Sequence, residues 1–168
     1  HLNATEGRAT FDPVRARAFV MQAVARSNVA FPREGLIYVF REVISACLNL
    51  QKPLRVGYLG PRDTFAHQAA TREFGSSVDS YSFKIIREVF TAIVHGTIDY
   101  GVVPIENSTG GTVHTTLDAF IEHDCRICSE ILLPIHHSLL SAVPMDQIQR
   151  IYSHPQAFLQ CDQWLRQN

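Results

Sequence analysis

The sequence has no block of basic residues, no long apolar run and little charge of either sign. Its 15 Lys and Arg residues are balanced by 16 Asp and Glu residues, which gives a formal net charge of -1. Because nucleic-acid-binding surfaces concentrate Lys and Arg, this balance argues against a nucleic-acid partner. No apolar run reaches the roughly 18 residues that a membrane-spanning helix requires, and no signal peptide is visible. We therefore expect a cytoplasmic protein that binds neither nucleic acid nor membrane.

Cysteine is also scarce, and the four cysteines form no complete metal-binding pattern. Cys125 and Cys128 have the spacing of a redox or zinc half-site, but no second pair completes it. They fall in a segment with strand-like composition, whereas redox pairs lie at a helix N-terminus. His136 and His137 are adjacent, so on a strand they would point to opposite faces and could not readily bind one ion. We predict buried, reduced cysteines and no metal site.

The chain does have a large apolar fraction, 46% of its residues, arranged in two different patterns. Up to Gln51 the apolar residues recur at helical spacing, and Asp12 followed by Pro13 is typical of a helix start. This spacing predicts helices over about 13–28 and 33–51. Two helices cannot enclose a core of their own. We therefore expect them to pack on a segment absent from this sequence or on another copy of the chain.

The pattern changes at Lys52-Pro53 and becomes an alternation of short strands and helices. We predict strands at 54–59, 78–83 and 100–105 and helices at 64–74, 85–95 and 115–123. This order is typical of an α/β fold with a mostly parallel sheet and right-handed crossovers. The sequence thus predicts two domains, a partial helical domain over residues 1–52 and an α/β domain over residues 53–168.

The rest of the chain has a mainly extended composition. Strand-like segments at 126–135, 137–143 and 151–153 are interrupted by Pro134 and Pro144. A helix over about 157–167 follows, and we expect Trp164 to lie in the core. Because this helix follows a long extended passage, it can belong to a second lobe.

The stretch from Tyr100 to His114 combines a short apolar strand, a polar turn and a helix start. In open α/β sheets, ligand-binding groups lie at the carboxyl ends of strands. Gly110 and Gly111 let the backbone turn sharply, and the free amides of the next helix favour an anion. A well-capped loop would have the same composition. The residues alone leave both interpretations open.

Three strand-to-helix corners carry neutral hydrogen-bonding groups of the same kind. They contribute Thr64, His67 and Gln68; Glu106, Asn107, Ser108 and Thr109; and Ser153, His154, Gln156 and Gln160. Such groups at helix N-termini suit a small polyanionic ligand. Glu106 can be a general acid, a binding group or a cap of the following helix, and we expect His154 to hold its own turn. No phosphate loop, dinucleotide fingerprint or nucleophile elbow is present.

Four ordered motifs resemble the prephenate dehydratase family. They begin with Tyr58-Leu59-Gly60-Pro61, Pro104-Ile105-Glu106-Asn107-Ser108, Glu130 (to His137) and Tyr152-Ser153-His154-Pro155-Gln156. Residues 11–15 and 40–46 resemble the second and third helices of the chorismate mutase domain that precedes the dehydratase in bifunctional proteins. The resemblance implies a chain that converts chorismate to prephenate and prephenate to phenylpyruvate, on the route to phenylalanine.

The resemblance also implies a fold and a site. The family's dehydratase has two lobes, like a periplasmic-binding protein, with prephenate in the cleft between them. The implied site residues are catalytic Glu106, Asn107 and Ser108, substrate-binding Thr64, Thr109, Ser153 and Gln160, and the mutase-site remnants Asp12, Arg15 and Gln51. No cofactor is implied, because loss of carbon dioxide and water makes the ring aromatic and supplies the driving force.

The chain departs from the family pattern in ways that bear on activity. The family's Thr-Arg-Phe motif, most of the second lobe and the regulatory ACT domain are absent, as is the first mutase helix. Ala16 follows Arg15 where the family typically has Glu. We therefore expect a fragment that is inactive alone, and a homodimer for the intact protein, because the apolar helix faces need a partner. The alternative is a non-catalytic module of the same two-lobed fold that binds a small anion or an amino acid.

Overall fold

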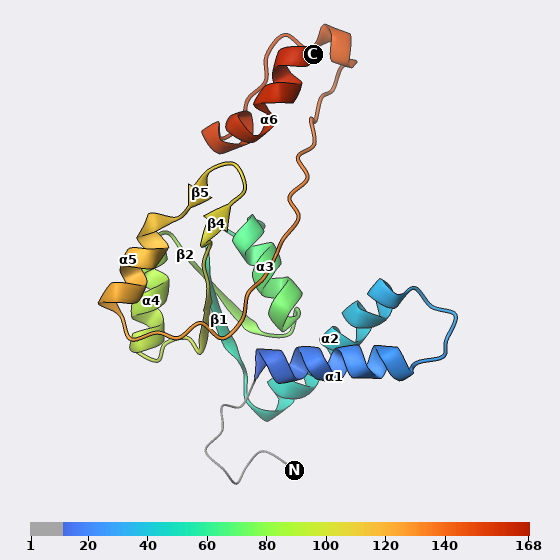
Figure 1. Cartoon of the computed structure of the whole chain (residues 1–168), viewed down its shortest axis with the longest axis vertical. Coiled ribbons are helices and arrows are strands. Elements are labelled where there is room, and N and C mark those ends of the chain that lie inside the picture. The colour runs from blue at the N-terminus through green and yellow to red at the C-terminus, as the bar shows by residue number, and fades with distance from the viewer. Residues whose placement is uncertain (1–11) are drawn as a thin grey trace.

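The chain folds as two helices followed by an α/β unit (Figure 1). The structure is a computed structural model, and it describes residues 12–168; the start of the predicted 1–52 domain lies outside the described residues. The helices α1 (Pro13–Arg26) and α2 (Arg33–Gln51) match their predicted ranges closely. Asp12 caps α1, because its carboxylate accepts hydrogen bonds from the backbone amides of Val14 (3.0 Å) and Arg15 (3.1 Å).

The α/β unit contains a parallel sheet, as predicted. Its strands β1 (Arg55–Leu59), β2 (Asp79–Phe83) and β3 (Tyr100–Val102) lie in the order β2-β1-β3. In the register, Val56 pairs with Ser80 of β2 and with Tyr100 of β3. The connecting helices are α3 (Phe65–Phe74) and α4 (Ile86–Val94). This architecture confirms the α/β class and is consistent with a lobe of the periplasmic-binding-protein type.

The core of the unit depends on two glycines that face each other in the register, Gly57 on β1 and Gly101 on β3. A Cβ atom on Gly57 would lie 2.5 Å from Cδ1 of Ile98, and one on Gly101 would lie 2.5 Å from Cγ1 of Val89. Real Cβ atoms do not approach other atoms so closely, so the missing side chains let α4 and its neighbours pack directly on the strands. Val56, Val89 and Ile98 are buried to 2% exposure or less.

The first two helices pack on the α/β unit of the same chain, which corrects the expectation that they contact only an absent segment or another copy. Ser45 on α2 is 2% exposed and lies against Gly75, at the end of α3. The Glu42 carboxylate accepts hydrogen bonds from the backbone amide and the hydroxyl of Ser76. Other apolar side chains of these helices, including Phe19 and Leu50, remain exposed.

The predicted strands at 126–135, 137–143 and 151–153 are wrong. The structure has an extended segment without ladder pairing from residue 124 to 144, a short 3₁₀ turn at Met145–Gln147 and coil up to α6 (Pro155–Gln167). Side chains still alternate along the segment: Ser129, Ile131 and Leu133 are half-buried, and the residues between them are exposed. The alternation of apolar and polar residues therefore reflects an extended segment with one side against the rest of the protein and the other side in solvent. A strand also needs a partner with free backbone groups.

Two predictions of burial are also wrong. Trp164 is 42% exposed, because α6 contains no buried residue and does not join the core. Cys47 and Cys128 are exposed, and Cys125 and Cys161 are half-buried. None of the four thiols forms a disulfide in the structure.

Candidate active site

A short hairpin, which the sequence did not predict, follows the strand β3. Its strands β4 (Glu106–Asn107) and β5 (Gly111–Thr112) are antiparallel, with Asn107 opposite Gly111. Gly111 has a φ of +70°, a value that favours glycine. The predicted polar turn is therefore a structured platform that presents Glu106, Ser108 and Thr109 as exposed side chains.

The Asn107 side chain is the node of the hairpin. Its Oδ1 atom accepts hydrogen bonds from the backbone amides of Thr109 (2.9 Å) and Gly110 (3.1 Å). It also accepts one from Nε2 of Gln160 on α6, at 3.1 Å. Because these donors fix the oxygen, the Nδ2 group must face the other way. Asn107 thus has two N–H donors available for a ligand.

Gln160 continues this chain of hydrogen bonds to a third residue. The Nε2 group of Gln160 donates a hydrogen bond to Asn107. Its Oε1 atom therefore faces Nε2 of His137, at 2.7 Å. An amide oxygen only accepts, and His137 must therefore carry its proton on Nε2. Sequence reasoning weighed His137 only as a metal ligand and missed this role. No local signal could have revealed it, since 23 positions separate the two residues.

The first corner lies beside this network. The Phe65 ring at the start of α3 contacts the His137 ring edge-on, with centroids 6.0 Å apart. Thr64 precedes Phe65, and its hydroxyl lies within hydrogen-bonding distance of the backbone oxygens of Leu59 (3.1 Å) and Pro61 (2.9 Å). Its proton therefore serves the turn, and the Thr64 oxygen remains able to accept a hydrogen bond.

The third corner packs on the hairpin. His154 caps α6 by accepting a hydrogen bond from the Gln156 backbone amide (3.2 Å), which confirms its predicted role in the turn. The Gln156 side-chain nitrogen lies 3.0 Å from the position that a Cβ atom on Gly110 would occupy. Ser153, immediately before the cap, is exposed. The three predicted corners are thus linked in series: Phe65 of α3 contacts His137, and His137 is joined through Gln160 of α6 to the hairpin.

Hydrogen bonds from the start of α5 (His114–Glu122) anchor the residues that lead into the hairpin. The Thr116 hydroxyl is fully buried and donates a hydrogen bond of 2.6 Å to the backbone oxygen of Pro104. The Val113 amide donates to the Ile105 oxygen at 2.9 Å. The start of α5 has no side-chain cap. The interpretation of Glu106 as a helix cap is therefore wrong, and its carboxylate stays on the exposed face of the hairpin.

The predicted mutase-site residues lie elsewhere, on α1 and α2. Asp12 uses its carboxylate to cap α1, while Arg15 and Gln51 are exposed. None of these residues belongs to the hairpin network. Within residues 12–168, no cluster of three or more His, Cys, Asp and Glu side chains could hold a metal ion. The same part of the chain contains no helix long and apolar enough to cross a membrane.

Comparison with known proteins gives these motifs a family context. A curated bifunctional chorismate mutase/prephenate dehydratase from Stutzerimonas stutzeri is 46% identical over 160 residues, which cover 94% of this chain and 44% of that protein. The bifunctional protein of Pseudomonas aeruginosa is 46% identical over 151 residues, or 88% of this chain and 41% of its own. A prephenate dehydratase from Lactococcus lactis is 40% identical over 114 residues, or 67% of this chain and 40% of its own.

This chain therefore spans less than half the length of these curated relatives. No solved structure matches it significantly. The model of the prephenate dehydratase family matches residues 56–168, a span that contains the sheet, the hairpin and α6. Because that match covers most of the chain and includes every member of the hairpin network, the chain belongs to the prephenate dehydratase family.

Proposed function

We propose that the full reading frame encoding this chain converts prephenate to phenylpyruvate, as one activity of a bifunctional chorismate mutase and prephenate dehydratase. The observation that carries this proposal is the hydrogen bond between Asn107 and Gln160. It joins two family motifs that lie 53 positions apart. A packed loop without a function would not need two amides held in fixed orientation beside exposed hydroxyls.

The reaction needs few groups from the protein. Prephenate carries two carboxylates and a ring hydroxyl. The bond from the ring to one carboxylate breaks, its electron pair enters the ring, and the hydroxyl leaves with a proton as water. The N–H groups of Asn107 and the hydroxyls of Ser108 and Thr109 orient the anionic substrate. Glu106 supplies the carboxyl group that protonates the departing hydroxyl, a role that typically contributes about 10²–10⁴-fold. Thr64, Ser153 and Gln160 complete the substrate contacts.

The remaining assignments are part of the same proposal. Residues 1–52 belong to the mutase domain, with Asp12, Arg15 and Gln51 at its chorismate site, and residues 53–168 belong to the dehydratase domain. The family match beginning at residue 56 supports this division. The exposed apolar side chains on α1 and α2 support a homodimer of the intact protein. A cytoplasmic location fits a pathway whose substrates are soluble metabolites.

The test is direct. The protein from the full reading frame is incubated with prephenate, and phenylpyruvate is quantified by chromatography. We expect turnover without an added cofactor. Tight binding of prephenate without any product would instead support a binding module of the same fold. A parallel incubation with arogenate, followed for phenylalanine, identifies which of the two related acids is the substrate.

A further inference from the structure

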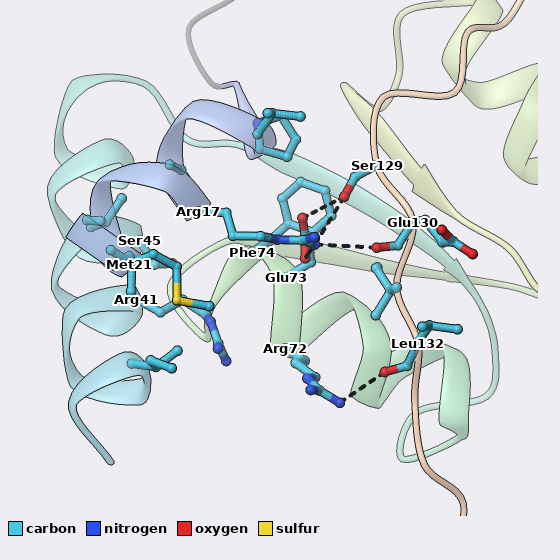
Figure 2. Close-up of a pocket in the computed structure, with 17 residues that line it drawn as sticks. Arg17, Met21, Arg41, Ser45, Arg72, Glu73, Phe74, Ser129, Glu130 and Leu132 are labelled. Atoms are coloured by element: carbon cyan, nitrogen blue, oxygen red, sulfur yellow. Dashed lines mark hydrogen bonds and ion pairs between the residues drawn. The ribbon is translucent and has the colours of Figure 1, made fainter. Parts of the chain in front are cut away.

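A second region of the molecule has the features of a ligand site and lies away from the hairpin. An open pocket of about 510 Å³ is lined by residues of α1, α2, α3 and the extended segment 129–132 (Figure 2). This volume falls in the range of small-molecule sites. None of the residues assigned above to the dehydratase or mutase site lines it.

One side of the cavity is formed by an ion pair between an arginine and a glutamate. Glu73 of α3 has a side chain only 9% exposed, and it accepts hydrogen bonds from Arg17 of α1 (2.7 Å) and from the Ser129 hydroxyl (2.8 Å). The Glu130 carboxylate points away from this network, on the far side of the segment (Figure 2). Glu73 and Glu42 nevertheless act on Arg41 through their charge, although neither carboxylate forms an ion pair with it.

Two guanidinium groups in the cavity have no carboxylate partner among the described residues. Arg41 lies over the Tyr38 ring, 5.0 Å from its centroid. Arg72 donates a hydrogen bond of 3.1 Å to the backbone oxygen of Leu132. Burial is the main cause that lowers the pKa of Arg41, and the charge of Arg72 also lowers it, while Tyr38, Glu73 and Glu42 raise it. Both guanidinium groups therefore keep N–H donors from which an anion in the cavity can accept hydrogen bonds.

The other wall of the cavity is apolar. Val20, Met21, Ile37, Ile44 and Phe74 line it. A free inorganic anion would leave this wall uncovered, whereas a carboxylate with an alkyl or aryl body would cover the wall and reach the cations at once. We propose that this cavity binds a small amphipathic carboxylate, with its anionic group held by Arg41 and Arg72. Such a ligand touches both the helical segment and α3, so its binding stabilises their contact.

The test uses hexanoate as the probe and the whole 168-residue chain, with affinity measured by calorimetry at low salt. Hexanamide has the same alkyl body without the charge, and we expect it to bind at least about tenfold more weakly. Arg41→Gln and Arg72→Gln should each weaken hexanoate binding by about tenfold, because each removes a charge-assisted hydrogen bond. Arg150→Gln, at an exposed arginine that does not line the cavity, is the matched control and should bind like the parent.

The proposal is overturned if hexanoate does not bind, or if hexanamide binds equally well, whatever the variants do. It is also overturned if the Arg41→Gln and Arg72→Gln double variant keeps the parent affinity. None of these outcomes depends on prephenate turnover, so the proposed dehydratase activity stands or falls separately.

Discussion

At the scale of single residues, two backbone amides determine the orientation of three side chains. The Thr109 and Gly110 amides fix the oxygen of Asn107. That oxygen in turn fixes the amide of Gln160, and Gln160 fixes the tautomer of His137. Rotation of any amide in this chain would place two donors or two acceptors face to face. The network is therefore preorganised without any ligand, which is the property that the proposed catalytic role requires.

The substitution Asn107→Asp separates the structural role of Asn107 in the hairpin from its proposed role in binding substrate. The aspartate keeps the oxygen that holds the hairpin and loses the N–H donors, and it adds a negative charge beside an anionic substrate. We expect the free energy of unfolding to change little and kcat to fall by about 10²–10³-fold, the loss typical for one preorganised donor. Urea unfolding and phenylpyruvate formation by the full reading frame measure the two effects. Parent-like activity would show that Nδ2 contacts no substrate.

His137→Ala tests whether His137 positions Gln160. Without the histidine, Gln160 loses one of its two partners and samples other rotamers, so we expect kcat/KM to fall by about tenfold with an unchanged melting temperature. His136→Ala is the matched control, because His136 is adjacent and exposed. The positioning role is refuted if His136→Ala and His137→Ala lose activity equally. It is also refuted if His137→Ala lowers the activity of a Gln160→Ala variant by the same factor as it lowers that of the parent.

At the scale of elements, the hairpin depends on its contact with α5. Thr116→Val keeps the shape of the side chain and removes the buried hydroxyl, which leaves the Pro104 oxygen without its 2.6 Å partner. We expect a loss of about 1–3 kcal/mol in the free energy of unfolding, measured in urea. Thr115→Val is the control, since Thr115 is the exposed neighbour on the same helix. Equal effects of the two substitutions would contradict the anchoring role.

An ion pair joins Arg55 of β1 to Asp99, the residue before β3, and its contribution to stability depends on pH. The Asp99 carboxylate accepts hydrogen bonds from the Arg55 guanidinium (2.8 and 3.1 Å) and from its backbone amide (3.0 Å). The side-chain hydrogen bond of Arg55 is the main cause that lowers the pKa of Asp99 below its ordinary 3.8. The folded carboxyl thus holds its proton more weakly than the unfolded one. Its stabilising contribution is present above pH 3.8 and is lost as the pH falls through the lower folded pKa.

Asp99→Asn removes this dependence. We expect the variant to be less stable than the parent at neutral pH, and the difference to shrink below pH 3.8 as Asp99 of the parent becomes protonated. Urea unfolding at a series of pH values measures the difference. Asp124→Asn, at an exposed position, is the control. A difference that is constant with pH would show that the carboxylate charge contributes nothing.

Secondary-structure elements that depend on neighbouring residues were predicted correctly from the sequence. Features that depend on contacts between distant residues were not. The cap at Asp12, the parallel sheet and the helices each follow from residues near one another in the chain. The segment 124–144 has strand composition, but pairing depends on a partner strand, which no local pattern encodes. In the same way, the corners were predicted from Asn107 and Gln160 separately. Their hydrogen bond, and the part that His137 plays in it, depend on how α6 packs on the hairpin.

At the scale of the whole molecule, two polar networks connect segments that are distant in the sequence. The bond from Asn107 to Gln160 ties α6 to the hairpin, and the bond from Arg17 to Glu73 ties α1 to α3. In Figure 1, α6 lies at one end of the molecule and the helical segment α1–α2 lies beside the α/β unit. The first network contains residues predicted for the dehydratase site, and the second borders the cavity proposed for a carboxylate.

The most direct test of the account compares phenylpyruvate formation by the full reading frame, by its Asn107→Ala variant and by the 168-residue chain alone. The account predicts turnover by the full protein, a loss of about 10²-fold or more in the variant and no turnover by the chain alone. Because Ala also removes the acceptor of the hairpin bonds, circular dichroism checks that the variant remains folded. Parent-like turnover by a folded Asn107→Ala variant would contradict the central claim, since Asn107 would then be a turn residue only.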